Sequence, residues 1–113
     1  MTETQGGPSS VYRINKFTVP TEEREEFLDL LEKTHAVMRA QHGFVRDLIL
    51  EQQSDPDVCD LFTLIELAGP DAVSRVTAAI ADQDRVLGLD RKEIVSRLGI
   101  RSSAWLLKAV QLS

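Results

Sequence analysis

The sequence predicts a single α+β domain of the ferredoxin-like type, in which helices cover one face of an antiparallel sheet. The chain has 113 residues, which is enough for one hydrophobic core and too few for two of ordinary size. Its apolar fraction of 42% and charged fraction of 27% are typical of globular domains. Its hydrophobic patterns follow the order strand, helix, strand, strand, helix, short helix, strand, which is the split βαβ arrangement.

The first predicted element is a strand over residues 11–19. It is rich in β-branched and aromatic side chains, which alternate between the two faces of a strand. Tyr12, Ile14 and Thr18 share one face, and Asn15, Phe17 and Val19 share the other. Residues 1–10 contain little that a core could bury, so we expect a disordered tail there and a folded domain over residues 11–113.

A long amphipathic helix is predicted to follow this strand. Thr21 is placed to cap the helix. Side chains suited to a core recur at intervals of three and four residues, which predicts one stripe that packs on the sheet. The stripe consists of Phe27, Leu28, Leu31, Thr34, His35 and Met38. Gly43 stands where the left-handed residue that ends a helix belongs.

A β-hairpin is predicted next, from residues 44–53 and 58–67 with a turn over residues 54–57. Apolar side chains occupy both faces of these strands, as in the run from Leu48 to Leu50. Helices cover only one face of the sheet, so a monomer would leave apolar surface in water. We therefore expect a homodimer in which the sheets of two copies pack against each other.

Two helices and a strand complete the expected fold. The second helix should begin with Pro70 at its first position. The short third helix should be capped by Asp90, with Glu93 three residues later, and should end at Gly99. The last strand is expected over residues 104–112.

Composition excludes several functional classes. The net charge is −5, and Arg and Lys are scattered, so no basic stripe is available for nucleic acid; this argues against the RNA-binding domains that share the element order. No apolar run approaches the ~20 residues of a membrane span, and no signal-peptide pattern is present. The single cysteine, Cys59, forms no internal disulfide, which fits a reducing compartment. We expect a cytoplasmic protein that binds neither membrane nor nucleic acid.

Four segments carry a likeness to a known family: residues 12–20 (YRINKFTVP), 24–27 (REEF), 41–45 (QHGFV) and 50–52 (LEQ). With them the chain resembles the antibiotic biosynthesis monooxygenases, small ferredoxin-like proteins that form dimeric α/β barrels. The resemblance implies a pocket between the sheet and the helices of each subunit. In some members it also implies oxygenation of aromatic substrates without metal or flavin, so we expect no cofactor.

Other members of that family degrade haem, and Asn15 matches the first-strand Asn of that branch. The chain departs from the rest of the haem pattern. Ile65, Glu66 and Leu67 stand where the resemblance implies a Trp, and no His follows His42, so a haem would lack its usual axial ligand. Haem degradation is therefore a minor alternative.

Asn15 and His35 are the candidate catalytic residues. Asn15 lies on the strand face that helices should cover, where its carboxamide needs hydrogen-bond partners. It is either an anchor for a substrate or oxygen species, or a structural Asn bonded to backbone. His35 lies on the apolar stripe and is either a general base or a buried structural His. His42 is too far along the helix to share a metal ion with it, and no metal site is expected.

Further residues are candidates for contact with the substrate: Phe17, Leu31, Met38, Glu66 and Trp105. Glu66, like Glu51, lies in an apolar strand run and is either a base with a raised pKa or the partner of an Arg from the other subunit. Trp105 either lines a flat aromatic site or packs at the dimer surface. We expect Cys59 to be a small apolar filler.

These patterns lead to one function and one alternative. The first is a small cofactor-independent monooxygenase that acts on an aromatic or quinone-like molecule. The alternative is a non-catalytic dimeric ligand-binding or accessory protein on the same scaffold, because a fold does not fix a function. The sequence contains no glycine-rich phosphate loop, metal-ligand spacing or serine elbow, which argues against the commoner cofactor and hydrolase classes.

Overall fold

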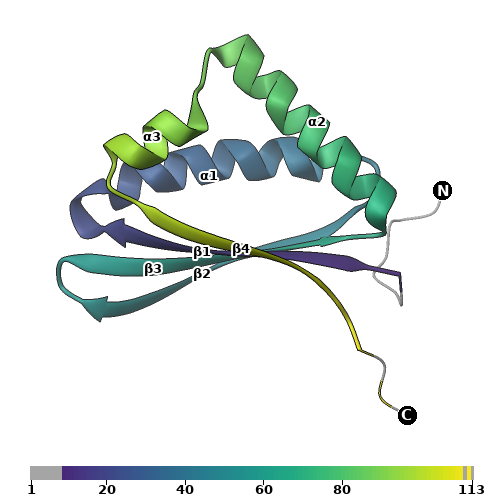
Figure 1. The fold of residues 1–113 in the computed structure, drawn as a ribbon, viewed down its shortest axis with the longest axis horizontal. Helices are drawn as coiled ribbons and strands as arrows, with labels where there is room; N and C mark the ends of the chain where they lie inside the picture. The colour runs from purple at the N-terminus through teal and green to yellow at the C-terminus, as the bar shows by residue number, and fades with distance from the viewer. Residues whose placement is uncertain (1–8, 111, 113) are drawn as a thin grey trace.

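The computed structural model describes residues 9–110 and residue 112. It confirms the α+β ferredoxin-like fold: a four-stranded antiparallel sheet carries its helices on one face (Figure 1). The elements, in chain order, are β1 (Val11–Pro20), the short 3₁₀ helix η1 (Thr21–Glu23), α1 (Arg24–Arg39), β2 (Phe44–Asp55), β3 (Val58–Leu67), α2 (Pro70–Leu87), α3 (Arg91–Arg97) and β4 (Arg101–Lys108).

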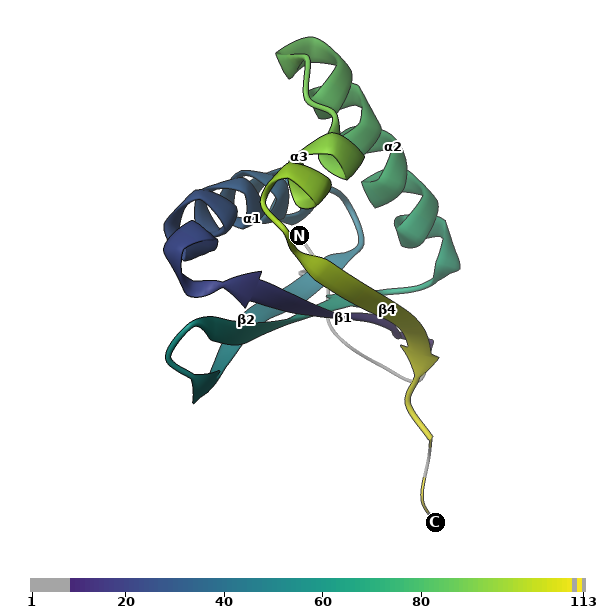
Figure 2. The ribbon, with the colours of Figure 1, turned by 60° about the vertical axis from the view of Figure 1, so that its left-hand side comes forward.

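The strand order β2-β3-β1-β4 places β1 in the interior of the sheet. Asn15 lies opposite Thr63 of β3 and Ala104 of β4. Side chains alternate along a strand, so the odd-numbered residues of β1 face the helices and the even-numbered ones face away. Asn15 therefore lies on the helix-facing side of β1, and β1 itself runs through the sheet beneath the helices (Figure 2).

Helix α1 is held over the sheet by its apolar stripe and by ion pairs to β2. Phe27, Leu31, Thr34, His35 and Met38 are buried, as the spacing predicted. At the start of the helix the Arg24 guanidinium contacts both oxygens of Glu51, at 2.7 and 2.9 Å. Near its end Arg39 binds Asp47 in the same way. Cations of α1 thus meet carboxylates on the helix-facing side of the edge strand.

The apolar core consists of two separate clusters. The first joins α1 and the start of β3 to the segment between α3 and β4, and its buried members are Val19, Phe27, Leu31, Cys59, Leu61, Leu98 and Ile100. The second joins the end of α1 to α2, and its buried members are Met38, Ile65, Leu67, Ala72 and Val76. A cavity lined by residues of both clusters lies between them.

Most predicted turns and caps are confirmed. Pro70 is the first residue of α2, and the Asp90 carboxylate accepts a hydrogen bond from the backbone N–H of Glu93 at 3.1 Å. Gly99 has a φ of 71° and Gly43 a φ of 95°, both in the left-handed region. A β-carbon on Gly43 would also lie 2.6 Å from that of Ala72, so glycine is required where the chain passes under α2.

The predicted cap of the first helix is wrong. Thr21 begins η1, and its hydroxyl is buried without a hydrogen-bond partner among the described residues. Its backbone N–H donates instead to the carbonyl of Asp57, at 2.9 Å. This bond draws the chain into a 3₁₀ turn before α1 begins at Arg24.

The bounds of the last strand and of the tail also differ from expectation. Strand β4 begins at Arg101 rather than at residue 104, because Arg101 already pairs with Thr18 of β1. It ends at Lys108 rather than at residue 112, because Lys108 pairs with Val11, the first residue of β1. Residues 1–8 of the predicted tail lie outside the described residues. Ser10, however, is 1% exposed, and the hydroxyl of Ser9 donates to the carbonyl of Ala68, so both pack against the end of β3.

The face of the sheet away from the helices carries large apolar side chains that are exposed in the single chain. Leu48 and Leu50 of β2 are 44% and 54% exposed, and Trp105 and Leu107 of β4 are 47% and 45% exposed. The register places all four with Tyr12 and Ile14 on this outer face. No helix within the described ranges is both long and apolar enough to cross a membrane.

Candidate active site

A cavity of about 550 Å³ lies between the helices and the sheet face that they cover. Both core clusters border it, with Phe27 and Leu31 from the first and Met38 and Ile65 from the second. Five of the predicted site residues line it: Asn15, Phe17, Leu31, His35 and Met38. Pockets of this size and character bind small organic molecules.

His35 lines this cavity, and its imidazole contacts Asp47 of β2. Its side chain is 2% exposed, and Nδ1 lies 2.8 Å from Oδ2 of Asp47. Burial raises the pKa of Asp47, but hydrogen bonds from Arg39 and His35 outweigh it and hold that pKa below its usual value. Because Asp47 occupies Nδ1, Nε2 is the ring nitrogen that can exchange a proton with a molecule in the cavity.

Asn15 supplies a polar group on the floor of the cavity. Its side-chain Oδ1 is buried and has no hydrogen-bond partner among the described residues. A buried polar atom without a partner costs free energy, and such atoms are uncommon in native proteins. A hydrogen-bond donor on a bound molecule would satisfy it.

Arginine side chains supply positive charge at the cavity wall. Arg91 lies at the start of α3, where it donates to Thr34 at 2.7 Å and to Asp84 at 2.6 and 2.8 Å. Its charge is balanced by Asp84. Arg13 also lines the cavity and forms no ion pair with any described residue. The cavity therefore combines apolar walls with an imidazole, a carboxamide and a cation, which suits a flat molecule with ionisable oxygens.

Four polar residues at or beside the cavity were not predicted from the sequence. Arg13 and Asp47 could have been found by strand alternation, because Arg13 shares a face with Asn15, and Asp47 lies on the helix-facing side of β2. Asp84 and Arg91 meet only because the chain reverses at Gly88, which has a φ of 67°. No local sequence pattern predicts this ion pair between Asp84 and Arg91.

Two predicted substrate contacts lie away from the cavity. Glu66 and Trp105 are on the outer face of the sheet, since each pairs with an even-numbered residue of β1. Glu66 accepts a hydrogen bond from Arg46 of its own chain, Nε to Oε1 at 2.8 Å. Burial acts to raise the pKa of Glu66, but hydrogen bonds from Arg46, Ser10 and Tyr12 hold it below its usual value. The raised pKa that we considered for a base is wrong here.

Glu51 and Cys59 have structural roles. The hydrogen bonds from Arg24 of the same chain lower the pKa of Glu51, so Glu51 is also not a poised base. Cys59 is 0% exposed in the first core cluster, and burial raises the pKa of its thiol. This is the apolar filler that we expected.

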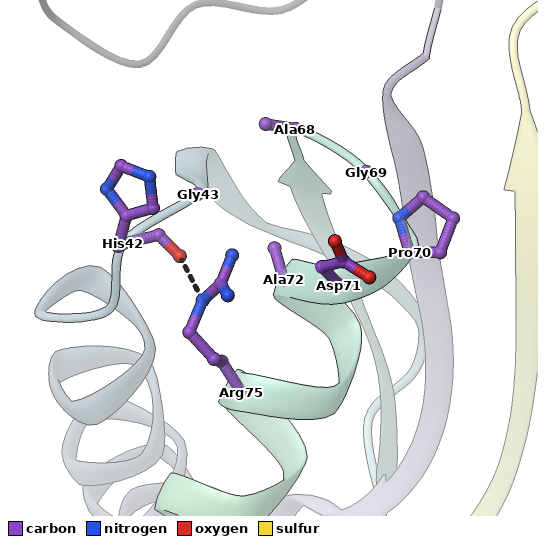
Figure 3. Close-up of a pocket in the computed structure, with 8 residues that line it drawn as sticks. All are labelled: His42, Gly43, Ala68, Gly69, Pro70, Asp71, Ala72 and Arg75. Atoms are coloured by element: carbon purple, nitrogen blue, oxygen red, sulfur yellow. Dashed lines mark hydrogen bonds between the residues drawn. The ribbon is translucent and has the colours of Figure 1, made fainter.

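A smaller hollow of about 280 Å³ lies between the loop that follows α1 and the start of α2 (Figure 3). Arg75 reaches from α2 and donates from Nε to the backbone carbonyl of His42 at 3.1 Å. His42 itself is exposed. Across the described part of the chain, no group of three or more His, Cys, Asp or Glu side chains is placed to hold a metal ion.

The fold resembles those of several solved structures. SnoaB, a cofactor-independent oxygenase from Streptomyces nogalater, aligns with a TM-score of 0.68 and 25% identity over 92% of this chain and 96% of its own. A protein from Deinococcus radiodurans that is proposed to be an antibiotic biosynthesis monooxygenase aligns with a TM-score of 0.64 and 15% identity, over 91% and 95% of the two chains. This chain has the fold of the antibiotic biosynthesis monooxygenase family.

The likeness of this chain to known proteins is one of structure. No family model matches the chain, and no curated protein matches it. The same fold also aligns with a de novo designed protein, Foldit4, with a TM-score of 0.60 and 9% identity over 89% of this chain and 99% of that one. The fold alone therefore does not imply a reaction.

Proposed function

We propose that the protein is a cofactor-independent monooxygenase that acts on an aromatic or quinone-like small molecule in the cavity beneath α1. The observation that carries this proposal is that a buried imidazole and an unpartnered carboxamide oxygen, His35 and Asn15, line one apolar cavity. The similarity to SnoaB, itself named a cofactor-independent oxygenase, supports it.

In this proposal His35 is the base and Asn15 the polar anchor. His35 accepts a proton from an acidic carbon or hydroxyl of the substrate, and the electron pair stays on the substrate. That electron pair reduces dioxygen, and a carbon–oxygen bond forms. The resulting peroxide anion takes the proton back from His35, and the hydroperoxide so formed loses water. A CH₂ group thus becomes a ketone, with one oxygen atom in the product and one in water. Phe17, Leu31 and Met38 hold the ring system in place.

The test is dioxygen consumption by the purified metal-free protein with a panel of anthrones and hydroquinones. We expect uptake by the wild type and a loss of about 10²-fold or more in kcat for His35→Ala, the scale of a missing general base. Asn15→Ala should also lower uptake. His42→Ala is the matched control, because that imidazole is exposed and lies outside the cavity. Full activity of both cavity variants would refute the site assignment.

A non-catalytic ligand-binding protein is the second candidate, because a fold does not fix a function and this fold is also that of a de novo designed protein. It predicts saturable binding of the same aromatic compounds with no dioxygen uptake. Calorimetric titration beside the oxygen electrode separates the two functions.

Haem degradation is not supported by the residues present. Helix α2 contributes Thr77, Ile80, Ala81 and Asp84 to the cavity. None of these is a usual axial ligand of haem iron. The chain therefore offers no anchor for haem on that helix.

We further propose that the protein is a homodimer, joined through the outer faces of two sheets and working in the cytoplasm. Leu48 and Leu50 on β2 and Trp105 and Leu107 on β4 are exposed on this face, and the register places Leu64 and Ile14 between Leu48 and Trp105. This apolar row across the sheet is a surface that a second copy would cover. Light scattering at micromolar concentration should give the mass of two chains, and Trp105→Arg should give one. Val86→Arg is the control, because Val86 is 74% exposed but lies on α2. A monomeric wild type would refute the dimer.

A further inference from the structure

We propose that Asp47 is a positioning residue that fixes the tautomer of His35, so that Nε2 carries the lone pair that accepts the substrate proton. This inference rests on the proposed function and adds to it a residue outside the cavity. Asp47 belongs to β2, whereas His35 belongs to α1. Its role is to act through His35 and not on the substrate.

The contacts of Asp47 suit a residue that orients the imidazole of His35. Oδ2 lies 2.8 Å from His35 Nδ1 and 2.7 Å from Arg39 Nη2, while Oδ1 lies 3.2 Å from Arg39 Nε. The Asp47 side chain is 13% exposed, so water competes little for these contacts. Two bonds from one planar guanidinium fix the orientation of the carboxylate, and the carboxylate in turn fixes the imidazole.

An ionised carboxylate accepts hydrogen bonds but cannot donate them. The proton of neutral His35 must therefore be on Nδ1, where Asp47 accepts it, and Nε2 is left unprotonated. The lowered pKa of Asp47 keeps the carboxylate ionised. A neutral imidazole whose free nitrogen is fixed by a second residue is the arrangement that a general base needs.

Arg39 neutralises the charge of the Asp47 carboxylate. Arg39 and Asp47 are together neutral before the reaction, so His35 faces an ion pair and not an isolated carboxylate. When Nε2 takes the substrate proton, a nitrogen–hydrogen bond forms and the substrate bond to hydrogen breaks, with no change in oxidation state at His35. The positive charge then lies beside Asp47. The other charged groups at the cavity are Arg13, Asp84 and Arg91, and the last two neutralise each other.

The test reads the tautomer directly by long-range nitrogen-15 correlation NMR at about pH 9, above the range in which imidazoles ordinarily titrate. The chain has only two histidines, and His42→Ala leaves the signals of His35 alone. We expect the wild type to show the proton on Nδ1 as the main form. In Asp47→Leu, which is similar in size but has no acceptor, the Nδ1-protonated form should become the minor one.

Glu32→Leu is the matched control, because Glu32 contacts the same Arg39 at 3.4 Å but is exposed and does not contact His35. It should leave the tautomer unchanged. A wild type with the proton on Nε2, or an Asp47→Leu protein with an unchanged tautomer and a folded circular dichroism spectrum, would overturn the proposal. If Asp47→Leu does not fold, the wild-type spectrum alone still decides.

The spectra need no substrate, so they test the role of Asp47 separately from the reaction. With an active substrate, Asp47→Asn should lower kcat by about 10-fold to 10²-fold with KM little changed, since Asp47 touches no substrate. Unchanged kcat in Asp47→Asn together with a large loss in His35→Ala would refute the role of Asp47 and leave the oxygenase intact. Absence of any turnover would count against the oxygenase alone.

Discussion

Arg91 donates a hydrogen bond from Nη1 to the hydroxyl of Thr34 at 2.7 Å, and so joins α3 to α1 across the wall of the cavity. The same guanidinium holds Asp84 of α2. One side chain therefore connects the three helices at the point where the two core clusters leave a gap. The chain that continues from α3 becomes β4, so this contact also helps to place the strand that closes the sheet.

Arg91→Met should lower the free energy of unfolding by about 1–3 kcal/mol, between the values for surface and buried ion pairs, because Asp84 is left 17% exposed without its partner. Urea denaturation followed by circular dichroism measures the change. Arg85→Met removes a pair with Asp82 that is 74% and 60% exposed, and should have little effect. Equal effects of the two substitutions would contradict a structural role for Arg91.

Asn15→Leu should leave the stability unchanged or raise it by about 1 kcal/mol, since it removes a buried oxygen that has no partner among the described residues. The same substitution should weaken ligand binding and lower turnover. Thermal unfolding and calorimetric titration with the same protein samples check both effects. A clear loss of stability would mean that the carboxamide is a structural group and not a ligand anchor.

Gly43→Ala should destabilise the protein by about 2 kcal/mol or more. It places a β-carbon 2.6 Å from that of Ala72 at a φ of 95°. Gly88→Ala is the control, because Gly88 also has a positive φ, of 67°, but nothing lies within 4 Å of the added carbon. Its cost should be only the backbone strain, about 1 kcal/mol. Equal losses in urea denaturation would show that the contact with α2 is easily relieved.

The stability of the protein should fall in acid partly through Glu66. Its pKa is lower in the folded chain than the usual value of 4.5, so the ionised form stabilises the fold above that value. As the pH drops below about 4.5 towards the folded pKa, this contribution is lost. Glu66→Gln should therefore flatten the dependence of unfolding free energy on pH between about pH 6 and pH 3.

Asp29→Asn is the control for this pH dependence, because Asp29 is exposed and forms no ion pair with any other described residue. It should leave the slope close to that of the wild type. A Glu66→Gln protein with the wild-type slope would contradict the contribution of the Arg46 bond.

The sequence predicted the elements well where a local pattern decides them. Period-three-and-four spacing placed Phe27 and Met38 on the buried side of α1, and the Asp90 cap located the start of α3. The start of β4 was missed because Arg101 and the two serines after it are polar and exposed, and so lack the apolar pattern of a strand. They form a strand only because β1 offers them its free edge.

The candidate site was also predictable only in part, because local patterns do not show which face of the sheet the helices cover. Asn15 and His35 stand out as polar residues on apolar faces, and both do line the cavity. Glu66 and Trp105 also stand out, but the register turns them to the other side of the sheet. Which of two faces meets the helices is decided by the whole sheet and not by one strand.

The division of the core into two clusters with a cavity between them has a practical consequence. A molecule that fills the cavity touches Leu31 of the first cluster and Met38 of the second, and so bridges the two clusters. Any such ligand stabilises the folded form by mass action, by about 2.7 kcal/mol at a hundred times its dissociation constant. A rise in melting temperature can therefore identify occupants of the cavity from a compound library before any turnover is known.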